Sequence, residues 1–210
     1  NTVTSSVTST HTVDTAVDSL SADIVDGSDT GSSNSDNITN DNTPTITGST
    51  EAGATVVITN ANGDTVGSAT ADSDGNYTIT TSGLADGTQD LTVTATDTAG
   101  NTTSTTQSIE VDTSTSNSID IVDEGADNVI NASEVATSDI SGNVEAGSTI
   151  NSIVITDGTN SVTVSPSDVT LNSDGSYSVD NVDVSSLDDG NLNVTVISTD
   201  VAGNTTSSTD

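Results

Sequence analysis

The chain has 210 residues, of which 32 are Asp or Glu, none is Lys or Arg and one is His, so its formal net charge is −32. Nucleic-acid binding and a basic membrane-surface helix both require Lys and Arg, so this composition excludes them. No carboxylate has a side-chain cation to pair with except His11. The acids must therefore be solvated, hydrogen-bonded to backbone N–H groups or bound to a metal ion.

The remaining composition narrows the class of protein. Ser and Thr together number 75, Val, Ile and Leu together number 44, and Phe, Trp, Met and Cys are absent. This places the chain near the boundary of intrinsic disorder and excludes disulfides and thiolate metal sites. No apolar run reaches the roughly 18 residues that span a membrane, and no signal peptide opens the chain. The acidity favours a salty or extracellular setting, and we expect a fragment of a longer secreted protein.

An internal repeat decides between disorder and a fold. Three phrases recur in the same order about a hundred residues later: Glu51-Ala52-Gly53 as Glu145-Ala146-Gly147, Ser73-Asp74-Gly75 as Ser173-Asp174-Gly175, and Asp97-Thr98-Ala99-Gly100-Asn101 as Asp200-Val201-Ala202-Gly203-Asn204. The recurrence predicts two related domains, repeat 1 at 16–113 and repeat 2 at 114–210. Residues 1–15 resemble the stretch that begins at Asn101. We therefore expect them to be the last strand of a preceding repeat, and we expect repeat 2 to lack its own last strand.

The local pattern is that of β-strands. Apolar residues alternate with Thr, Ser or Asn at period two, and Asn-Gly or Asp-Gly turn signals recur every 8 to 12 residues or so. In repeat 1 the pattern predicts strands at 22–26, 44–50, 54–60, 66–71, 77–81, 91–97 and 103–111. No long amphipathic helix is predicted. We expect an all-β protein made of two tandem immunoglobulin-like β-sandwich domains, about seven strands each, end to end.

The strand order brings certain carboxylates together. In such a sandwich successive loops alternate between the two ends, so Glu51 and Asp97 share one end of repeat 1 with Asp14, which enters from the preceding segment. The corresponding set in repeat 2 is Glu145, Asp200 and Asp112. Carboxylates gathered without a cation repel one another. Ca²⁺, which takes about six to eight oxygen ligands, suits flexible loops better than Mg²⁺, so these six acids are the first-rank candidates for metal ligands.

A second rank of acids has weaker support. Asp72, Asp74 and Asp174 lie in turns at the same ends, but Asp-Gly is a turn signal by itself, and a solvated turn residue is the competing interpretation. Asp86 is expected at the end of repeat 1 opposite Glu51 and Asp97, and Asp189 is its counterpart in repeat 2. The first-strand region of each repeat carries further acids whose spacing does not match an EF-hand. Two interpretations stay open there, an intradomain Ca²⁺ site and no site. These acids are Asp23, Asp26, Asp29, Asp36 and Asp41 in repeat 1, and Asp120, Asp123, Asp127 and Glu134 in repeat 2.

Several phrases resemble a known family. At Glu-Ala-Gly, Ser-Asp-Gly-x-Tyr, Asp-x-Ala-Gly-Asn-Thr and residues 127–134, the chain resembles the bacterial immunoglobulin-like repeats of giant surface adhesins, including the extender repeats of repeats-in-toxin adhesins. The resemblance implies long tandem arrays on the bacterial cell surface, type I secretion, roles in cell adhesion and biofilms, and Ca²⁺ at or near domain junctions. The arrangement is also similar to that of cadherins, where linker and loop acids of two sandwiches share ions. The Gly-rich Ca²⁺-binding nonapeptide of the secretion-signal region is absent from the sequence, so this is not that region.

The sequence thus predicts a structural extender module, stiffened by Ca²⁺ at domain ends and junctions, that projects a distal adhesive domain. Its expected partners are adjacent repeats of the same chain, with no nucleic acid, no membrane insertion and no small-molecule substrate. The alternative is a module that itself binds glycan, protein or ice; Thr-x-Thr ladders such as 92–96 suggest an ice-binding face, but ordinary exposed strand positions account for them as well. An enzyme is not expected, because one His and no Cys, Lys or Arg leave only paired carboxylates, without an aromatic cleft.

Overall fold

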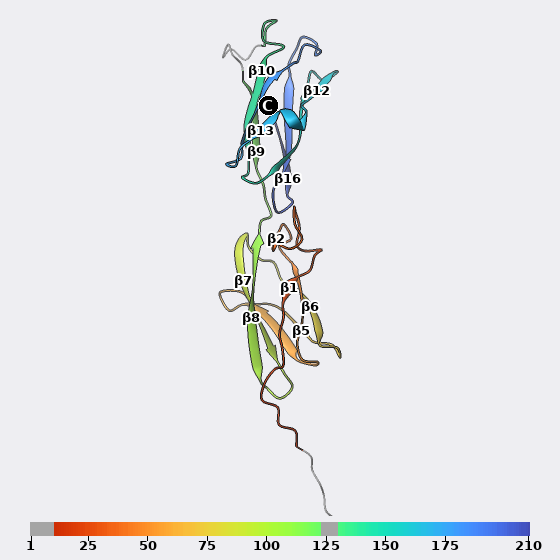
Figure 1. Ribbon diagram of the computed structural model, residues 1–210, viewed down its shortest axis with the longest axis vertical. Coiled ribbons are helices and arrows are strands. Elements are labelled where there is room, and N and C mark those ends of the chain that lie inside the picture. The colour runs from red at the N-terminus through yellow and green to blue at the C-terminus, as the bar shows by residue number, and fades with distance from the viewer. Residues whose placement is uncertain (1–10, 123–129) are drawn as a thin grey trace, which may run out of the picture. The chain divides into compact units, whose positions relative to one another are not determined.

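The computed structural model describes residues 11–122 and 130–210, and within these ranges the protein is all-β, which confirms the predicted fold class (Figure 1). The described residues contain one helical element, a single 3-10 turn, η1, at Pro166–Asp168. None of their helices is long and apolar enough to cross a membrane. The β-branched residues Thr, Val and Ile suit strands, and their alternation with polar residues gives each strand one apolar face.

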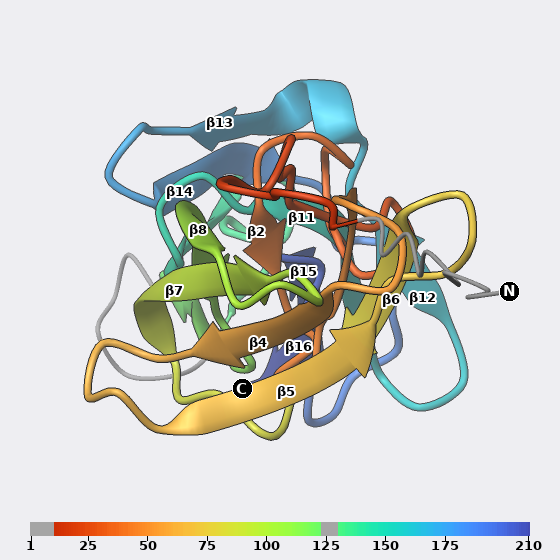
Figure 2. The ribbon, with the colours of Figure 1, turned by 90° about the horizontal axis from the view of Figure 1, so that it is seen from below.

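The strands of repeat 1 form two sheets. Their bounds are β1 (Asp23–Ile24), β2 (Ile38–Thr39), β3 (Thr45–Ser49), β4 (Thr55–Thr59), β5 (Thr65–Thr70), β6 (Asn76–Thr80), β7 (Gly87–Thr96) and β8 (Thr102–Val111). The sheet orders are β1-β3-β6 and β2-β8-β7-β4-β5, and Figure 2 shows β7, β4 and β5 side by side. Each of the seven predicted strands has a counterpart. The unpredicted β2, which pairs with β8 in parallel, is too short to produce a periodic pattern.

Repeat 2 has a similar plan, but among the described residues β2 has no counterpart and the strand that corresponds to β5 is divided between the two sheets. Its strands are β9 (Asn117–Val122), β10 (Ser138–Val144), β11 (Thr149–Thr156), β12 (Ser161–Thr163), β13 (Val169–Leu171), β14 (Ser176–Val182), β15 (Asn193–Thr199) and β16 (Thr205–Thr209). The sheet orders are β13-β14-β10-β9 and β12-β11-β15-β16. Where repeat 1 has β5, repeat 2 has β12 and β13 in opposite sheets with η1 between them. The place of the last strand, which we expected to be vacant, is taken by β16, with 5 residues against 10 in β8.

The described residues form two compact units whose border differs from the repeat border. Unit 1 contains 11–25, 43–83 and 89–108, and unit 2 contains 26–42, 84–88 and the described part of 109–210. Residues 26–42 and 84–88, which the sequence places in repeat 1, therefore join the same unit as repeat 2. The repeat boundaries at 16–113 and 114–210 rest on sequence similarity and stay a prediction, as does the role of 1–15, most of which lies outside the described residues.

An aliphatic core holds each sandwich together. In unit 1 the fully buried side chains include Ile46, Val56, Ile58, Leu91 and Val93, each with 0% of its surface exposed. In unit 2 they include Ile140, Ile153, Ile155, Val194 and Val196, each at most 1% exposed. Full burial of such a side chain contributes about 1.5–3 kcal/mol. The few aliphatic residues of this chain are thus concentrated on the inward faces of the strands, which is how a composition near the boundary of disorder supports a fold.

A Tyr–Gly pair occupies the same place in each repeat. Tyr77 on β6 lies opposite Gly48 on β3, and its hydroxyl donates to the carbonyl oxygen of Ser21. A Cβ on Gly48 would collide with that carbonyl and with the Tyr77 ring. The counterparts in repeat 2 are Tyr177, Gly142 and Ser118. Desolvation on burial raises the pKa of each tyrosine to about 12. Each ring therefore belongs to the core, and its hydroxyl fastens the first-strand segment to the rest of the sheet.

Replacement of Gly48 by Ala tests this packing. We expect Gly48→Ala to lower the free energy of unfolding by about 1–3 kcal/mol, because the added methyl group forces the Tyr77 ring and the Ser21 backbone apart. Urea denaturation measures the change. Gly83→Ala is the matched control, since the space around its Cβ position is open. Equal unfolding free energies for the two variants would contradict the packing role.

Candidate metal centres

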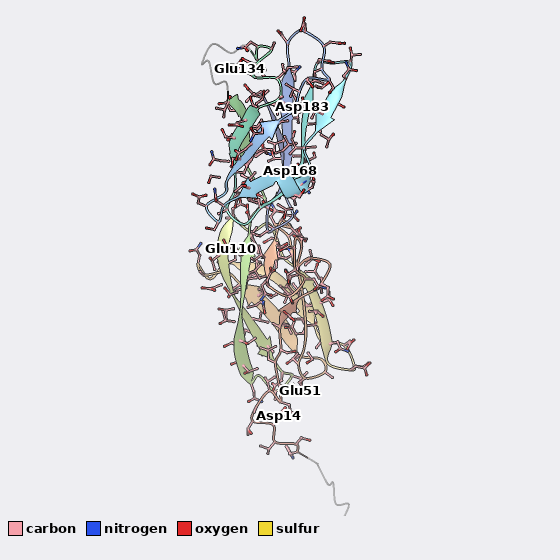
Figure 3. All side chains as sticks on the ribbon, turned by 45° about the horizontal axis from the view of Figure 1, so that its top comes forward. Asp14, Glu51, Glu110, Glu134, Asp168 and Asp183 are labelled. Atoms are coloured by element: carbon pink, nitrogen blue, oxygen red, sulfur yellow. The ribbon has the colours of Figure 1, made fainter. Side chains whose placement is uncertain are left out.

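Three carboxylates of unit 1 converge at one place. Asp14 comes from the segment before β1, Glu51 from the turn between β3 and β4, and Asp97 from the turn between β7 and β8. One carboxylate oxygen of each lies within 4.8 Å of the corresponding oxygens of the other two. Figure 3 labels Asp14 and Glu51, which lie beside each other. We call this group the first triad.

Three carboxylates of unit 2 repeat the arrangement. Asp112 directly follows β8, Glu145 lies between β10 and β11, and Asp200 lies between β15 and β16. Their carboxylate oxygens also lie within 4.8 Å of one another, and we call this group the second triad. The two triads bring together all six first-rank candidates. That these residues bind a metal stays a prediction.

The local sequence fixes the aspartate of the first triad through a tight turn. Asp97 Oδ1 accepts hydrogen bonds from the backbone N–H of Ala99 at 2.9 Å and of Asn101 at 2.8 Å. Asp97 Oδ2 accepts one from Asn101 Nδ2 at 2.7 Å. Gly100 makes the turn possible with φ of 95°, a left-handed conformation that favours glycine. The phrase Asp-x-Ala-Gly-Asn therefore builds a turn that holds its own aspartate in one orientation.

The aspartate of the second triad is held in the same way. Asp200 Oδ1 accepts the backbone N–H groups of Gly203 at 2.8 Å and Asn204 at 2.9 Å, and Oδ2 accepts Asn204 Nδ2 at 2.8 Å. Asn204 Nδ2 also donates to the carbonyl oxygen of Asp112 at 2.8 Å. In the first triad, Asn101 Nδ2 lies 3.4 Å from Asp14 Oδ1. The asparagine of the turn thus connects the fixed aspartate to the acid that enters from the preceding segment.

The electrostatics of the triads are unfavourable for a third negative charge. Desolvation, and then the charges of Asp14 and Asp97, raise the pKa of Glu51 above its ordinary value. Desolvation and the charges of Asp112 and Asp200 raise the pKa of Glu145 likewise. In each triad, desolvation and the neighbouring carboxylates therefore disfavour ionisation of the glutamate, and a bound cation would favour it.

The pKa of Asp97 shifts in the opposite direction from that of Glu51. Desolvation, the largest single effect, raises its pKa, but the hydrogen bonds from Asn101, Gly100 and Ala99 together outweigh it and hold the pKa below its ordinary value. The carboxylate therefore stays ionised with only 6% of the residue exposed. A buried, ionised and oriented carboxylate is suited to coordinate a hard cation.

The second-rank turn acids are engaged within their own turns. Asp72 Oδ1 accepts the backbone N–H groups of Asp74 at 2.9 Å and Asn76 at 2.8 Å. Asp174 Oδ1 accepts Ser176 Oγ at 2.6 Å and the Ser176 N–H at 3.0 Å, and the hydroxyl and then the backbone bond lower its pKa. All three acids are exposed and none belongs to a triad. These contacts support the interpretation of these acids as turn residues.

The other second-rank acids also lie apart from the triads. Asp86 accepts the hydroxyl of Thr113 at 2.8 Å, next to Asp112 in the chain. Asp120 on β9 and Asp189 are exposed and line a groove of about 740 Å³ in unit 2. Asp123 and Asp127 lie outside the described residues. The remaining acids considered for intradomain sites belong to neither group of three found in the described ranges; they are Asp23, Asp26, Asp29, Asp36, Asp41 and Glu134.

Asp157, which precedes a glycine in one of the Asp-Gly turn signals, makes contacts that the sequence does not predict. Its carboxylate accepts the backbone N–H groups of Thr159, Asn160 and Asp188, each at 2.6 Å, and Asn160 Nδ2 at 3.0 Å. The bonds from Asn160, Asp188 and Thr159 hold the pKa of Asp157 well below its ordinary value. The local part of this site could be expected from Asp-Gly, but the bond from Asp188, 31 residues away, leaves no signal in the sequence.

Comparison with known proteins first defines the class. Residues 16–113 match the family described as bacterial Ig-like domain. No curated protein matches the chain significantly.

Solved structures then relate the chain to particular repeats, and the predicted resemblance is confirmed. A tetra-tandem repeat in the extending region of a large adhesion protein is 29% identical, covers 92% of this chain and 48% of its own, and has a TM-score of 0.40. A Ca²⁺-stabilized adhesin that helps an Antarctic bacterium reach out and bind ice is 29% identical over 96% of this chain and 50% of its own, with a TM-score of 0.53. A 1.5-MDa bacterial ice-binding adhesin is 24% identical over 90% of this chain and 61% of its own, with a TM-score of 0.47. The chain thus spans about half to three fifths of the solved chains it resembles.

The raised pKa values of the two glutamates predict a pH-dependent stability. In Ca²⁺-free buffer at pH 7, the double variant Glu51→Gln, Glu145→Gln should be more stable than the wild type, because Gln brings no charge into either triad. Each glutamate has a folded-state pKa above the ordinary value of 4.5, so its penalty is present above the folded-state pKa and is relieved as the pH falls through it. Urea denaturation between about pH 7 and pH 4.5 should show the difference between variant and wild type shrinking.

Glu110→Gln is the control for a general reduction of negative charge, because Glu110 lies outside both triads. The amide oxygen of the introduced Gln can still accept the hydrogen bond from the Thr88 hydroxyl. This control should give little of the gain at pH 7. An equal gain from the control, or a difference independent of pH, would show that the triads carry no special repulsion.

Proposed function

We propose that this protein is a structural extender module of a large bacterial cell-surface adhesin, and that Ca²⁺ bound at its two carboxylate triads stabilises and stiffens it. The observation that carries the proposal is the convergence of three carboxylates in each unit, in a sequence that has no Lys or Arg. Two unit charges 4 Å apart repel by about 1 kcal/mol in water and about 4 kcal/mol at an effective dielectric constant near 20. A hard divalent cation bound among the carboxylates would attract each of them and offset this repulsion.

The proposed ligands are the six carboxylates of the triads, and Ca²⁺ is the preferred ion. Ca²⁺ accepts carboxylate and carbonyl oxygens in flexible geometry, whereas Mg²⁺ requires a strict octahedron, and His and Cys ligands for other metals are scarce or absent. The second-rank acids are weaker candidates, because Asp72, Asp86 and Asp174 already accept hydrogen bonds from turn or neighbouring groups.

The chain positions of the ligands suggest a mechanical role. Asp112 follows the last strand of repeat 1, while Glu145 and Asp200 belong to loops of repeat 2. An ion shared by the three would tie the linker to two loops of the next repeat and so restrict bending there. Asp14 would do the same for the segment that precedes repeat 1.

The likeness to the Ca²⁺-stabilized adhesin, at 29% identity over 96% of this chain, supports the same role in a longer protein. In that proposal the chain is part of a tandem array on a bacterial cell surface, reached by secretion, in which adjacent repeats are its partners. The array would hold a distal adhesive domain away from the cell.

Thermal unfolding with and without Ca²⁺ tests the proposal. An ion that binds only the folded state adds about 2.7 kcal/mol per site at a hundredfold excess over Kd. We expect Ca²⁺ to raise Tm relative to chelator, and Asp97→Asn or Asp200→Asn each to remove about half of that increase because each disables one triad. Small-angle scattering of the same samples should show a shorter maximum dimension after chelation.

Asp180→Asn is the matched control, an exposed aspartate on β14 outside both triads. It should keep the full Ca²⁺ response, and Mg²⁺ at equal ionic strength should give a smaller one. Identical melting curves with and without chelator would refute Ca²⁺ stabilisation. A maximum dimension unaffected by Ca²⁺ would refute stiffening.

A further inference from the structure

Residues 26–42, which we call the latch segment, lie within repeat 1 in the sequence but belong to unit 2 in the structure. The segment is braced by its own hydroxyl groups. Thr39 Oγ1 donates to the carbonyl oxygen of Ser28, and the backbone N–H of Asn40 donates to Thr30 Oγ1 at 2.8 Å. These bonds give the latch segment a defined shape although it contains only the two residues of β2 as regular structure.

The latch segment is hydrogen-bonded to the turn at 200–204. Thr30 Oγ1 donates to the carbonyl oxygen of Ala202 at 2.7 Å, and the backbone N–H of Ser32 donates to the carbonyl oxygen of Val201 at 3.2 Å. Ala202 is fully buried, with 0% of its surface exposed. Both the latch segment and this turn lie in unit 2, so the contact is internal to one compact unit.

The two backbones touch at a glycine. Gly31 has φ of 87°, and a Cβ there would collide with the carbonyl group of Val201 and with Ala202. On the opposite side, a Cβ on Gly203 would lie only 3.1 Å from the Cα of Gly31. The contact therefore requires glycine at position 31 for two reasons, its conformation and its lack of a side chain.

The same turn carries Asp200 of the second triad. Gly203 and Asn204 donate their backbone N–H groups to Asp200 Oδ1, and Asn204 Nδ2 donates to the carbonyl oxygen of Asp112. The latch segment thus holds the turn at Val201 and Ala202. The triad holds the turn at Gly203 and Asn204.

We propose that the latch segment is a positioning element for the second triad: by holding the turn at 200–204, it keeps Asp200 oriented for the cation. Thr30 and Gly31 are then positioning residues that touch no ligand and act through the turn. This inference rests on the proposed Ca²⁺ binding, but the contact on which it depends exists without the ion. It follows that repeat 2 needs this part of repeat 1 for full Ca²⁺ affinity.

The test measures the second triad alone, in the 210-residue chain that carries Asp97→Asn to disable the first. Isothermal titration calorimetry with Ca²⁺ measures Kd in this background. Gly31→Ala should raise Kd by about tenfold. Gly63→Ala is the matched control, because Gly63 has φ of 86° but nothing within 4 Å of its Cβ position, so it carries the same conformational strain without the collision. Its Kd should not change.

A second pair of variants avoids the strain of the glycine change. Thr30→Val removes the hydroxyl that bonds Ala202 and should raise Kd, whereas Thr30→Ser keeps the hydroxyl and should retain the original Kd. If Gly31→Ala does not fold, this pair decides. Hydrogen exchange of the Ser32 amide in Ca²⁺-free protein reports on the latch contact itself and should be slow in the starting protein and faster in Thr30→Val.

The outcomes separate the two proposals. Unchanged Kd in Gly31→Ala and Thr30→Val would overturn the positioning role and leave Ca²⁺ stabilisation intact. Absence of Ca²⁺ binding in the Asp97→Asn background would overturn both, even where slow exchange of Ser32 shows the contact to be present. Equal losses in Gly31→Ala and Gly63→Ala would attribute the effect to glycine strain and also overturn the positioning role.

Discussion

Repulsion among carboxylates that have no cationic side chain to oppose it is the constraint on which the rest of this structure depends. With 32 acids and no Lys or Arg, the fold can hold acidic groups in solvent, against backbone N–H groups and neutral side-chain donors, or around an external cation. Asp180 is an example of the first, being exposed on a strand, and Asp157 is an example of the second, with three backbone donors at 2.6 Å. In the triads several acids converge where solvent is partly excluded, and these are the places where we propose an external cation.

The turn chemistry that builds the strands' connections also builds the triads. An aspartate that accepts N–H groups two and four residues ahead closes a tight turn, and the glycine in it supplies the left-handed conformation. At Asp72 this motif yields an exposed turn. Asp97 forms the same motif, and Asp200 forms a related one with donors three and four residues ahead. Both lie beside a glutamate loop and an incoming acid, so a local turn motif becomes part of a charged cluster. The difference lies in the position of the turn on the sandwich.

The sequence allowed the fold class and all six triad residues to be predicted, because loop alternation in a sandwich and the repeated phrases place Glu51 and Asp97 at one end. For the second-rank acids, the sequence could not decide between a solvated turn residue and a metal ligand. The sequence also could not predict which sheet β12 and β13 would join, because short strands with alternating residues suit either sheet. The packing of 26–42 against the turn at 200–204 depends on backbone contact between distant segments and leaves no periodic signal.

The most direct test of the account is to locate the ions. Crystals grown with millimolar Ca²⁺, or with Tb³⁺ in its place, give anomalous signals that mark bound metal. We expect one peak at each triad. At the second triad, an oxygen of each of Asp112, Glu145 and Asp200 should lie about 2.3–2.6 Å from the ion. A folded protein whose triads show no anomalous peak at that concentration would contradict the claim that these carboxylates need an external cation.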